Sequence, residues 1–214
     1  MTTKLDPKPG CAGRVRAVVD AVRPSVDGGR FAVKRVVGDE MVVEADCFSD
    51  GHDALRVMLR WRAEGGAKFN ETEMVALGND VWRGAFTLPT IGRYVYSVVA
   101  WVDHFASWRH ELARRVDADD IRIAAQVGAM LVERAATRAS AGDRKTLAAW
   151  AAKLQRGASD ARSDVDWLKA LALEDTLAAL ALSYPERGLE AAYPVELPLV
   201  VDRPRARASS WYEM

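Results

Sequence analysis

The sequence has little of what marks several large classes of protein. Cysteine occurs only twice in 214 residues, and the spacing of Cys11 and Cys47 fits neither a metal site nor a redox motif. No run approaches the ~18 consecutive apolar residues of a membrane-spanning helix, and the opening MTTKLDPKPGCAG lacks the apolar core of a signal peptide. Thirty basic and thirty acidic residues cancel, so the charge balance favours no nucleic-acid partner. We therefore expect a cytoplasmic protein with reduced thiols and no membrane partner.

Catalytic motifs are missing as well. The chain contains no G-x-S-x-G elbow, no Walker loop and no G-x-G-x-x-G. The three histidines, His52, His104 and His110, have no metal-ligand spacing. Carboxylates such as Asp46 and Asp103 fall in turns or on strand exteriors, where solvated or capping roles are expected. We predict no catalytic residue, no metal site and no cofactor.

Residues 31–116 show the alternation of half-buried strands. Apolar and polar side chains alternate in MVVEADCF (41–48), ALRVMLRWR (54–62) and VWRGAFTL (81–88), with turn-forming segments between them. This spacing is typical of an antiparallel β-sandwich. The many glycines and prolines of residues 1–29 predict a loose lead-in, with at most a short helix at 14–22.

One predicted strand is apolar on both faces. In YVYSVVAWVD (94–103), Tyr94, Tyr96 and Val98 share one face, while Val95, Val99 and Trp101 share the other. A strand with one solvated face does not need this pattern. We expect another part of the chain, or a partner, to cover the second face.

Residues 119–185 are alanine-rich and helical in pattern. Asp119 and Asp120 can cap a helix whose apolar stripe runs through Ile123, Val127 and Met130 or Leu131. Further caps are predicted at Asp143 and Ser163, with helix ends at Gly142, Gly157 and Pro185. The pattern leaves open whether 163–184 is one helix or two.

Period-two alternation returns at 195–201, where Pro198 indicates an edge position or a bulge. Because a lone strand is unstable, it is expected to rejoin the earlier sheet, which makes the helices an insertion. The predicted fold is mixed, an antiparallel β-sandwich with an inserted α-helical bundle. The predicted organisation is a lead-in at 1–29, a sandwich at 30–116 plus 193–207, and a helical bundle at 117–192.

Tryptophan is abundant, with seven residues. Those that alternate with Leu and Phe, Trp61 and Trp82, are expected in the core. Trp101 and Trp108 lie beside an already apolar face, so burial in an interface is expected first and stacking on a glycan second. Trp211 and Tyr212 form an aromatic pair near the end of the sequence, where polar residues are usual.

Several long stretches resemble one enzyme family. The runs RPSVDGGRFAVKRVVGDEMVVEADCFSDGHD (23–53), NDVWRGAFTL (79–88), GRYVYSVVAWVDHFASWRHEL (92–112) and VDRPRARASSWYEM (201–214) resemble the α-1,4-glucan:maltose-1-phosphate maltosyltransferases, of the α-amylase superfamily. The resemblance spans about 23–116 and 195–214. It implies an immunoglobulin-like amino-terminal sandwich with a helical insertion, followed by a catalytic (β/α)₈ barrel that is not in this sequence, and a homodimer. It also implies that 208–214 is the start of that catalytic domain and that Trp211 and Tyr212 pack on it.

Two hypotheses follow. In the first, implied by the resemblance, the chain is a non-catalytic dimerisation and scaffold region of a retaining maltosyltransferase that extends α-1,4-glucan from maltose 1-phosphate. By itself it is expected to be inactive, because no catalytic residue of the family can be carried over to it. In the alternative, it is a free-standing glycan-binding sandwich that binds α-glucan through Trp101 or Trp108.

Overall fold

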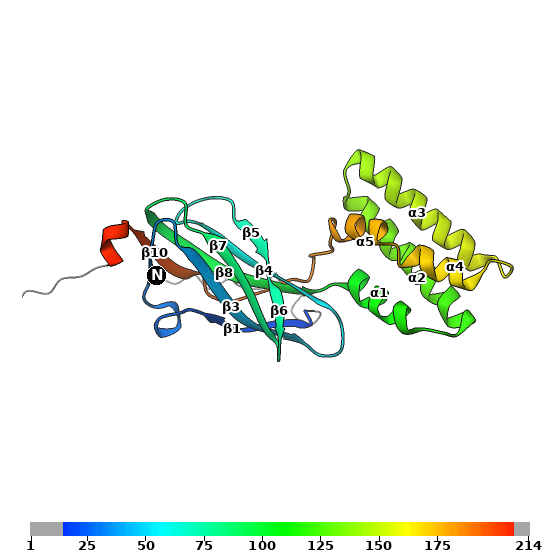
Figure 1. Ribbon diagram of the computed structural model, residues 1–214, viewed down its shortest axis with the longest axis horizontal. Coiled ribbons are helices and arrows are strands. Elements are labelled where there is room, and N and C mark those ends of the chain that lie inside the picture. The colour runs from blue at the N-terminus through cyan, green and yellow to red at the C-terminus, as the bar shows by residue number, and fades with distance from the viewer. Residues whose placement is uncertain (1–14, 208–214) are drawn as a thin grey trace, which may run out of the picture. The chain divides into compact units, whose positions relative to one another are not determined.

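The computed structural model describes residues 15–207, which form ten strands, five α-helices and two short 3-10 helices (Figure 1). The strands are β1 (Ala17–Arg23), β2 (Val33–Val36), β3 (Glu40–Ser49), β4 (Leu55–Ala63), β5 (Asn70–Glu73), β6 (Val75–Gly78), β7 (Val81–Thr87), β8 (Gly92–Val102), β9 (Ala191–Ala192) and β10 (Leu197–Asp202). The helices are α1 (His104–Arg114), α2 (Ala118–Arg138), α3 (Ala141–Ser159), α4 (Val165–Ala172) and α5 (Asp175–Leu182), with the 3-10 turns η1 (Asp27–Gly29) and η2 (Pro204–Arg207).

The strands form two sheets that share one core. One sheet has the order β1-β3-β7-β6, and the other has the order β2-β10-β8-β4-β5, with β9 added beside β8. Every pairing is antiparallel except that of β10 with β2. The predicted strands at 41–48, 54–62, 81–88 and 94–103 are all confirmed. In the first three, alternation in the sequence matches alternating burial, whereas β8 is buried on both faces over residues 96–101.

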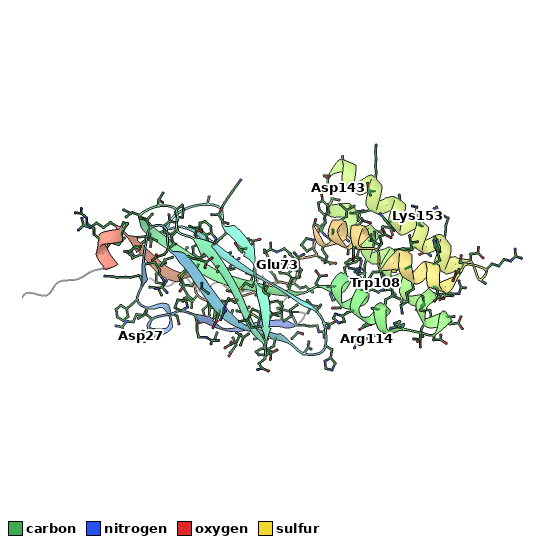
Figure 2. The ribbon with its side chains drawn as sticks, in the orientation of Figure 1. Asp27, Glu73, Trp108, Arg114, Asp143 and Lys153 are labelled. Atoms are coloured by element: carbon green, nitrogen blue, oxygen red, sulfur yellow. The ribbon has the colours of Figure 1, made fainter. Side chains whose placement is uncertain are left out.

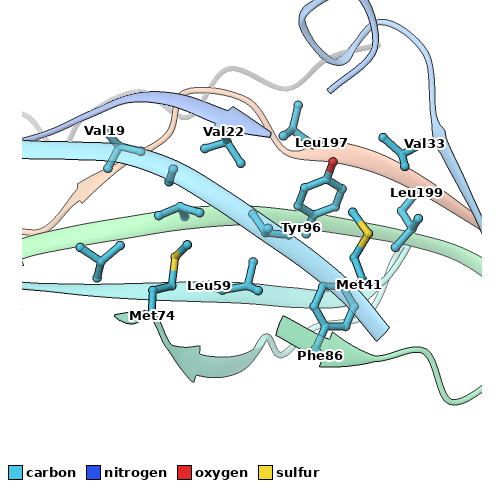
Figure 3. Close-up of a cluster of buried hydrophobic side chains, with 14 of the residues drawn as sticks. Val19, Val22, Val33, Met41, Leu59, Met74, Phe86, Tyr96, Leu197 and Leu199 are labelled. Atoms are coloured by element: carbon cyan, nitrogen blue, oxygen red, sulfur yellow. The ribbon is translucent and has the colours of Figure 1, made fainter. Parts of the chain in front are cut away.

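Side chains from both sheets meet between them (Figure 3). Met41 on β3 and Leu59 and Tyr96 on β4 and β8 are fully buried. The Trp61 ring of β4 stacks on Phe86 of β7 with centroids 4.6 Å apart, which ties the two sheets together and places Trp61 against the core as predicted.

The last strand, β10, rejoins the sheet as expected, but in its interior and not at its edge. β10 pairs with β8 from Leu197 to Val201 and with β2 from Leu199 to Asp202. Pro198 lies before the β2 ladder begins, so its missing N–H removes no hydrogen bond to β2. The proline therefore marks the start of an interior strand.

The prediction of a loose lead-in at 1–29 is wrong for the part that the structure describes. Residues 17–23 form β1, which pairs with β3, and the following turn is held by the Tyr96 hydroxyl, which donates to the carbonyl of Pro24. The glycines and prolines of this segment border the strand and do not interrupt it. Residues 1–14 lie outside the described part of the chain.

The helices have a core of their own, made largely of alanine. α2 packs most extensively against α3, and its buried side consists mainly of small residues, namely Ile121, Ala124, Ala125, Gly128, Ala129, Val132, Ala135 and Ala136. Small side chains let helix backbones approach closely, so the contact needs few large residues. The side chain of Arg122 fixes the α3–α4 loop by donating to the carbonyls of Asp160, Ala161 and Ser163.

Helix ends differ from the predicted caps by a few residues. Asp117 caps α2 in place of Asp119 or Asp120, Ser140 caps α3 in place of Asp143, and Asp164 caps α4 in place of Ser163. The side chain of each of these three capping residues accepts a hydrogen bond from a backbone N–H in the first turn of its helix, as is typical of an N-cap. Gly142 and Gly157 lie inside α3 and do not end helices. Residues 163–184 hold two helices, α4 and α5.

The described chain divides into two compact units. One holds residues 15–51, 55–102 and 189–207, and the other holds 52–54 and 103–188. The helical unit thus begins near 103, earlier than the predicted boundary at 117, because α1 starts at His104 directly after β8. Residues 52–54 belong with it, since the Ala54 N–H donates to Ser107 Oγ at 2.8 Å.

An ion pair on the outer face of the β1–β3 sheet gives a pH-dependent contribution to stability. Arg23 donates to both carboxylate oxygens of Asp46, at 2.8 and 2.5 Å, and this hydrogen bonding lowers the pKa of Asp46. Because the pKa of Asp46 is lower in the folded state than in the unfolded state, where it is near 4, the ion pair stabilises the fold at pH values above about 4. This contribution is lost as pH falls through the folded-state pKa of Asp46.

We expect Asp46→Asn to lower the free energy of unfolding by roughly 0.5 kcal/mol at pH 7, a small value because the pair is partly solvated. The difference from wild type should shrink as pH falls through the lowered folded-state pKa of Asp46. Urea unfolding at pH 7 and over a series of acidic pH values measures it, with Asp20→Asn, at an exposed position of β1, as the control. A difference that persists at low pH would show that the loss is not due to ionisation.

Candidate functional site

Trp108 lies in the core of the helical unit and not on a strand (Figure 2). Its side chain is 7% exposed, and its indole Nε1 donates to the Ala124 carbonyl at 2.7 Å. A Cβ placed on Gly128 of α2 would lie 2.0 Å from Cζ2 of Trp108, so the ring occupies the space that the glycine leaves. The indole therefore presents no open face on which a sugar could stack.

Trp101 is also buried. It lies on β8 and is 2% exposed, with the Arg56 guanidinium 5.7 Å from its ring centroid. Val99, on the same face of β8, is fully buried. We expected either another part of the chain or a partner to cover the second apolar face of this strand. At Val99 and Trp101 the chain itself covers it. Trp211 and Tyr212, the other two residues singled out from the sequence, lie outside the described residues.

Several carboxylates of the sandwich pair with arginines on its strands. Glu44 pairs with Arg83, Glu64 with Arg93, Glu73 with Arg56 and Glu196 with Arg62, at 2.5–2.9 Å. The buried carboxylate of Asp103 caps α1 by accepting from the Ala106 N–H at 2.9 Å. These groups have structural roles, as the sequence predicted for Asp46 and Asp103.

Residues 15–207 contain neither a metal-binding cluster nor a membrane-spanning helix. No three His, Cys, Asp or Glu side chains there come together in a way that could hold a metal ion. No helix of that part is both long enough and apolar enough to cross a bilayer.

The helix α2 carries a row of large apolar side chains on its exposed side. Ile123, Val127 and Met130 are 59%, 45% and 54% exposed, although an apolar stripe is the side that a helix usually buries. The predicted stripe is therefore not the core-facing side of the helix: the alanine side is buried instead, because Gly128 and its neighbours admit Trp108. The alanine periodicity was the signal that could have identified the true core side.

A groove runs beside this stripe, between α2 and α3. It has a volume of about 260 Å³ and is lined by Ala129, Met130, Glu133, Ala148, Ala151, Ala152 and Gln155. Four of these seven residues are alanines, while Glu133 and Gln155 supply its polar groups. An apolar stripe beside an apolar groove is a surface suited to protein contact.

Comparison with known proteins identifies relatives along almost the whole chain. The model of the family "Alpha-1,4-glucan:maltose-1-phosphate maltosyltransferase, domain N/S" matches residues 15–203. The maltosyltransferase of Chlorobaculum tepidum is 41% identical over 202 residues, which cover 94% of this chain and 29% of the relative. That of Myxococcus xanthus is 40% identical over 204 residues, covering 91% of this chain and 30% of the relative.

The chain therefore spans less than a third of the length of these two curated relatives. The matched region includes both compact units, the sandwich and the helices. The resemblance seen in the sequence is confirmed: the chain belongs to the family of the N/S domain of the α-1,4-glucan:maltose-1-phosphate maltosyltransferases.

Proposed function

We propose that this chain is the non-catalytic dimerisation and scaffold region of a maltosyltransferase that extends α-1,4-glucan with maltosyl units from maltose 1-phosphate. The observation that carries the proposal is the family match over residues 15–203, which takes in both units. The relatives named for this activity are about three times as long as the matched region. In this proposal the chemistry resides in a (β/α)₈ barrel in the remainder of the longer protein.

The scaffold is an immunoglobulin-like sandwich with a helical bundle inserted between its penultimate and last long strands. Support comes from the order of pairing: β8 precedes the helices, β10 follows them, and the two strands are neighbours in one sheet. The carboxylates paired with arginines and the capping role of Asp103 support a structural role for the acidic side chains. Cys47, a buried free thiol, supports a cytoplasmic location.

A chimera tests the scaffold role. Residues 1–214 would replace the matching region of the Chlorobaculum tepidum relative, and phosphate release from maltose 1-phosphate would be measured with a maltooligosaccharide acceptor. We expect the chimera to be active, because a region of the same family fold should support the rest of the relative as its own region does. The relative with the region deleted is the control and should lose most activity.

The isolated chain supplies the second half of the test. Residues 1–214 alone should release no phosphate, and light scattering should give twice the chain mass of 23.5 kDa. Phosphate release by the isolated chain would contradict a non-catalytic role. Undiminished activity in the deleted relative would contradict the scaffold role.

A further inference from the structure

One tryptophan of the helical unit stays open to solvent. Among the tryptophans of residues 15–207, Trp167 alone is exposed, at 50%, while Trp101 and Trp108 are buried and the other three are half-buried. Single exposed apolar residues are common on protein surfaces, so exposure by itself does not indicate a site. The way in which the chain holds this indole is more informative.

The ring of Trp167 rests on a glycine in the interior of α3. A Cβ at Gly157 would lie 3.2 Å from Cζ3 of Trp167 and 2.9 Å from Cδ1 of Leu168, so both side chains use space that the glycine leaves. Glycine is one of the least favourable residues in a helix interior. Its presence here lets α4 place a large aromatic ring against the backbone of α3.

The corner that presents Trp167 is fixed by hydrogen bonds. Asp164 caps α4, and its carboxylate accepts from the N–H groups of Asp166 and Trp167, at 2.9 and 3.5 Å. Arg122 of α2 donates to three carbonyls of the loop that joins α3 to α4 (Figure 1). A ligand that binds this corner would not need to order it, and preorganisation of this kind favours affinity.

Polar side chains lie near the exposed ring. Lys153 is exposed and lies one turn before the glycine, on the same side of α3. Asp164 and Asp166, which are also exposed, are among the three residues that precede Trp167. The corner therefore combines an aromatic ring with a hydrogen-bond donor and with carboxylate acceptors.

These groups match the chemistry of a sugar ring. The C–H face of a glucose unit is apolar and can stack on an indole, whereas the hydroxyls on its rim both donate and accept hydrogen bonds. A phosphate-bearing or acidic ligand would be repelled by the carboxylates of Asp164 and Asp166. A wholly apolar segment would remove water from these charged groups without replacing its hydrogen bonds.

We propose that the corner of α3 and α4 around Trp167 binds a glucose unit of an α-glucan chain. The indole supplies the stacking surface, Lys153 donates to the sugar hydroxyls, and Asp166 accepts from them. The inference rests on the proposed function, since it takes α-glucan to be the polymer that the longer protein extends. A polymer held at this corner keeps its chain ends at a high local concentration.

Electrophoresis of residues 1–214 in native gels that contain glycogen tests the site. Glycogen should retard the wild-type chain, and Trp167→Ala should raise the apparent dissociation constant about three- to tenfold. Phe31→Ala, which removes an aromatic residue of similar exposure (53%) from the sandwich, is the matched control and should bind as wild type does. Urea unfolding checks that Trp167→Ala is folded.

A second variant keeps the test valid if Trp167→Ala fails to fold. Asp166→Asn leaves the ring in place and should weaken binding about threefold, because an amide oxygen is a weaker acceptor than a carboxylate. Asp20→Asn, at an exposed position of β1, is its control and should bind as wild type does. Retardation of both Trp167→Ala and Asp166→Asn equal to that of wild type overturns the site.

The chimera with the Chlorobaculum tepidum relative measures the consequence for the reaction. Trp167→Ala should raise its KM for glycogen about three- to tenfold and leave kcat unchanged, because the corner holds the polymer and takes no part in the chemistry. With maltotetraose, which is too short to be held at a remote surface while it reacts, both constants should stay unchanged. An equal loss with both acceptors would show that Trp167 acts through the fold, and would overturn the inference.

The outcomes separate this inference from the proposed function. A wild-type chain that glycogen does not retard overturns the site and leaves the scaffold role standing, since the activity of the chimera tests that role. An inactive chimera, together with a chain whose retardation depends on Trp167, overturns the scaffold role and leaves the site standing.

Discussion

Gly128→Ala is expected to destabilise the helical unit by about 2–3 kcal/mol. The added Cβ would lie 2.0 Å from Cζ2 and 2.6 Å from Cε2 of Trp108, and a rigid indole held by a hydrogen bond to the Ala124 carbonyl cannot yield as a flexible chain could. Overpacking of this kind costs more than the ~1 kcal/mol that alanine gains over glycine as a helix former. Hydrogen exchange of the α2 amides and urea unfolding measure the loss.

Gly142→Ala is the matched control. Gly142 also lies in an α-helix, but nothing is within 4 Å of the position its Cβ would take. Alanine there should leave stability unchanged or raise it by up to about 1 kcal/mol. If both variants are equally stable, the close approach of α2 to the Trp108 ring is not what requires glycine at position 128.

Leu59→Ala should cost the sandwich about 2–5 kcal/mol, the usual range for a buried leucine. Leu59 is fully buried in the core between the sheets. Urea unfolding followed by hydrogen exchange of the β4 amides measures the effect. Leu77→Ala on β6, where the side chain is 50% exposed, should cost less than about 0.5 kcal/mol.

A second change can show that the loss is a cavity effect. A Cβ on Gly84 would lie 3.5 Å from Cδ2 of Leu59 and 2.8 Å from Cγ of Met74. With Leu59 truncated, the Met74 side chain has space to move, so Gly84→Ala should recover part of the stability lost by Leu59→Ala. A double variant whose losses simply add would contradict a shared cavity.

The β-strands were the most predictable part of the fold. Alternation of apolar and polar residues indicates a strand with one buried face, and β3, β4 and β7 follow it, whereas β8 is buried on both faces. β1 was missed because its segment is bordered by glycine and proline, and its alternation is short. Its pairing with β3, a contact between residues far apart in the sequence, decides its conformation, and local propensity does not record such contacts.

The candidate surface was less predictable than the strands. The sequence predicted an apolar stripe on α2, but the tight fit of Trp108 against Gly128 buries the alanine side and leaves that stripe exposed. Alanine periodicity is a weak signal, since alanine is favourable anywhere in a helix. The burial of Trp101 and Trp108 could not be predicted either, because aromatic side chains occur both in cores and on binding surfaces. Only the folded chain distinguishes the two.

The position of β10 in the interior of its sheet has a consequence for how the protein folds during synthesis. β10 lies between β2 and β8, and the ribosome makes it only after all of residues 103–188. Until then the edges of β2 and β8 lack their neighbour, while the helices, whose contacts are local, can already form. The sheet therefore cannot be completed until residues 197–202 have been synthesised and have inserted between β2 and β8.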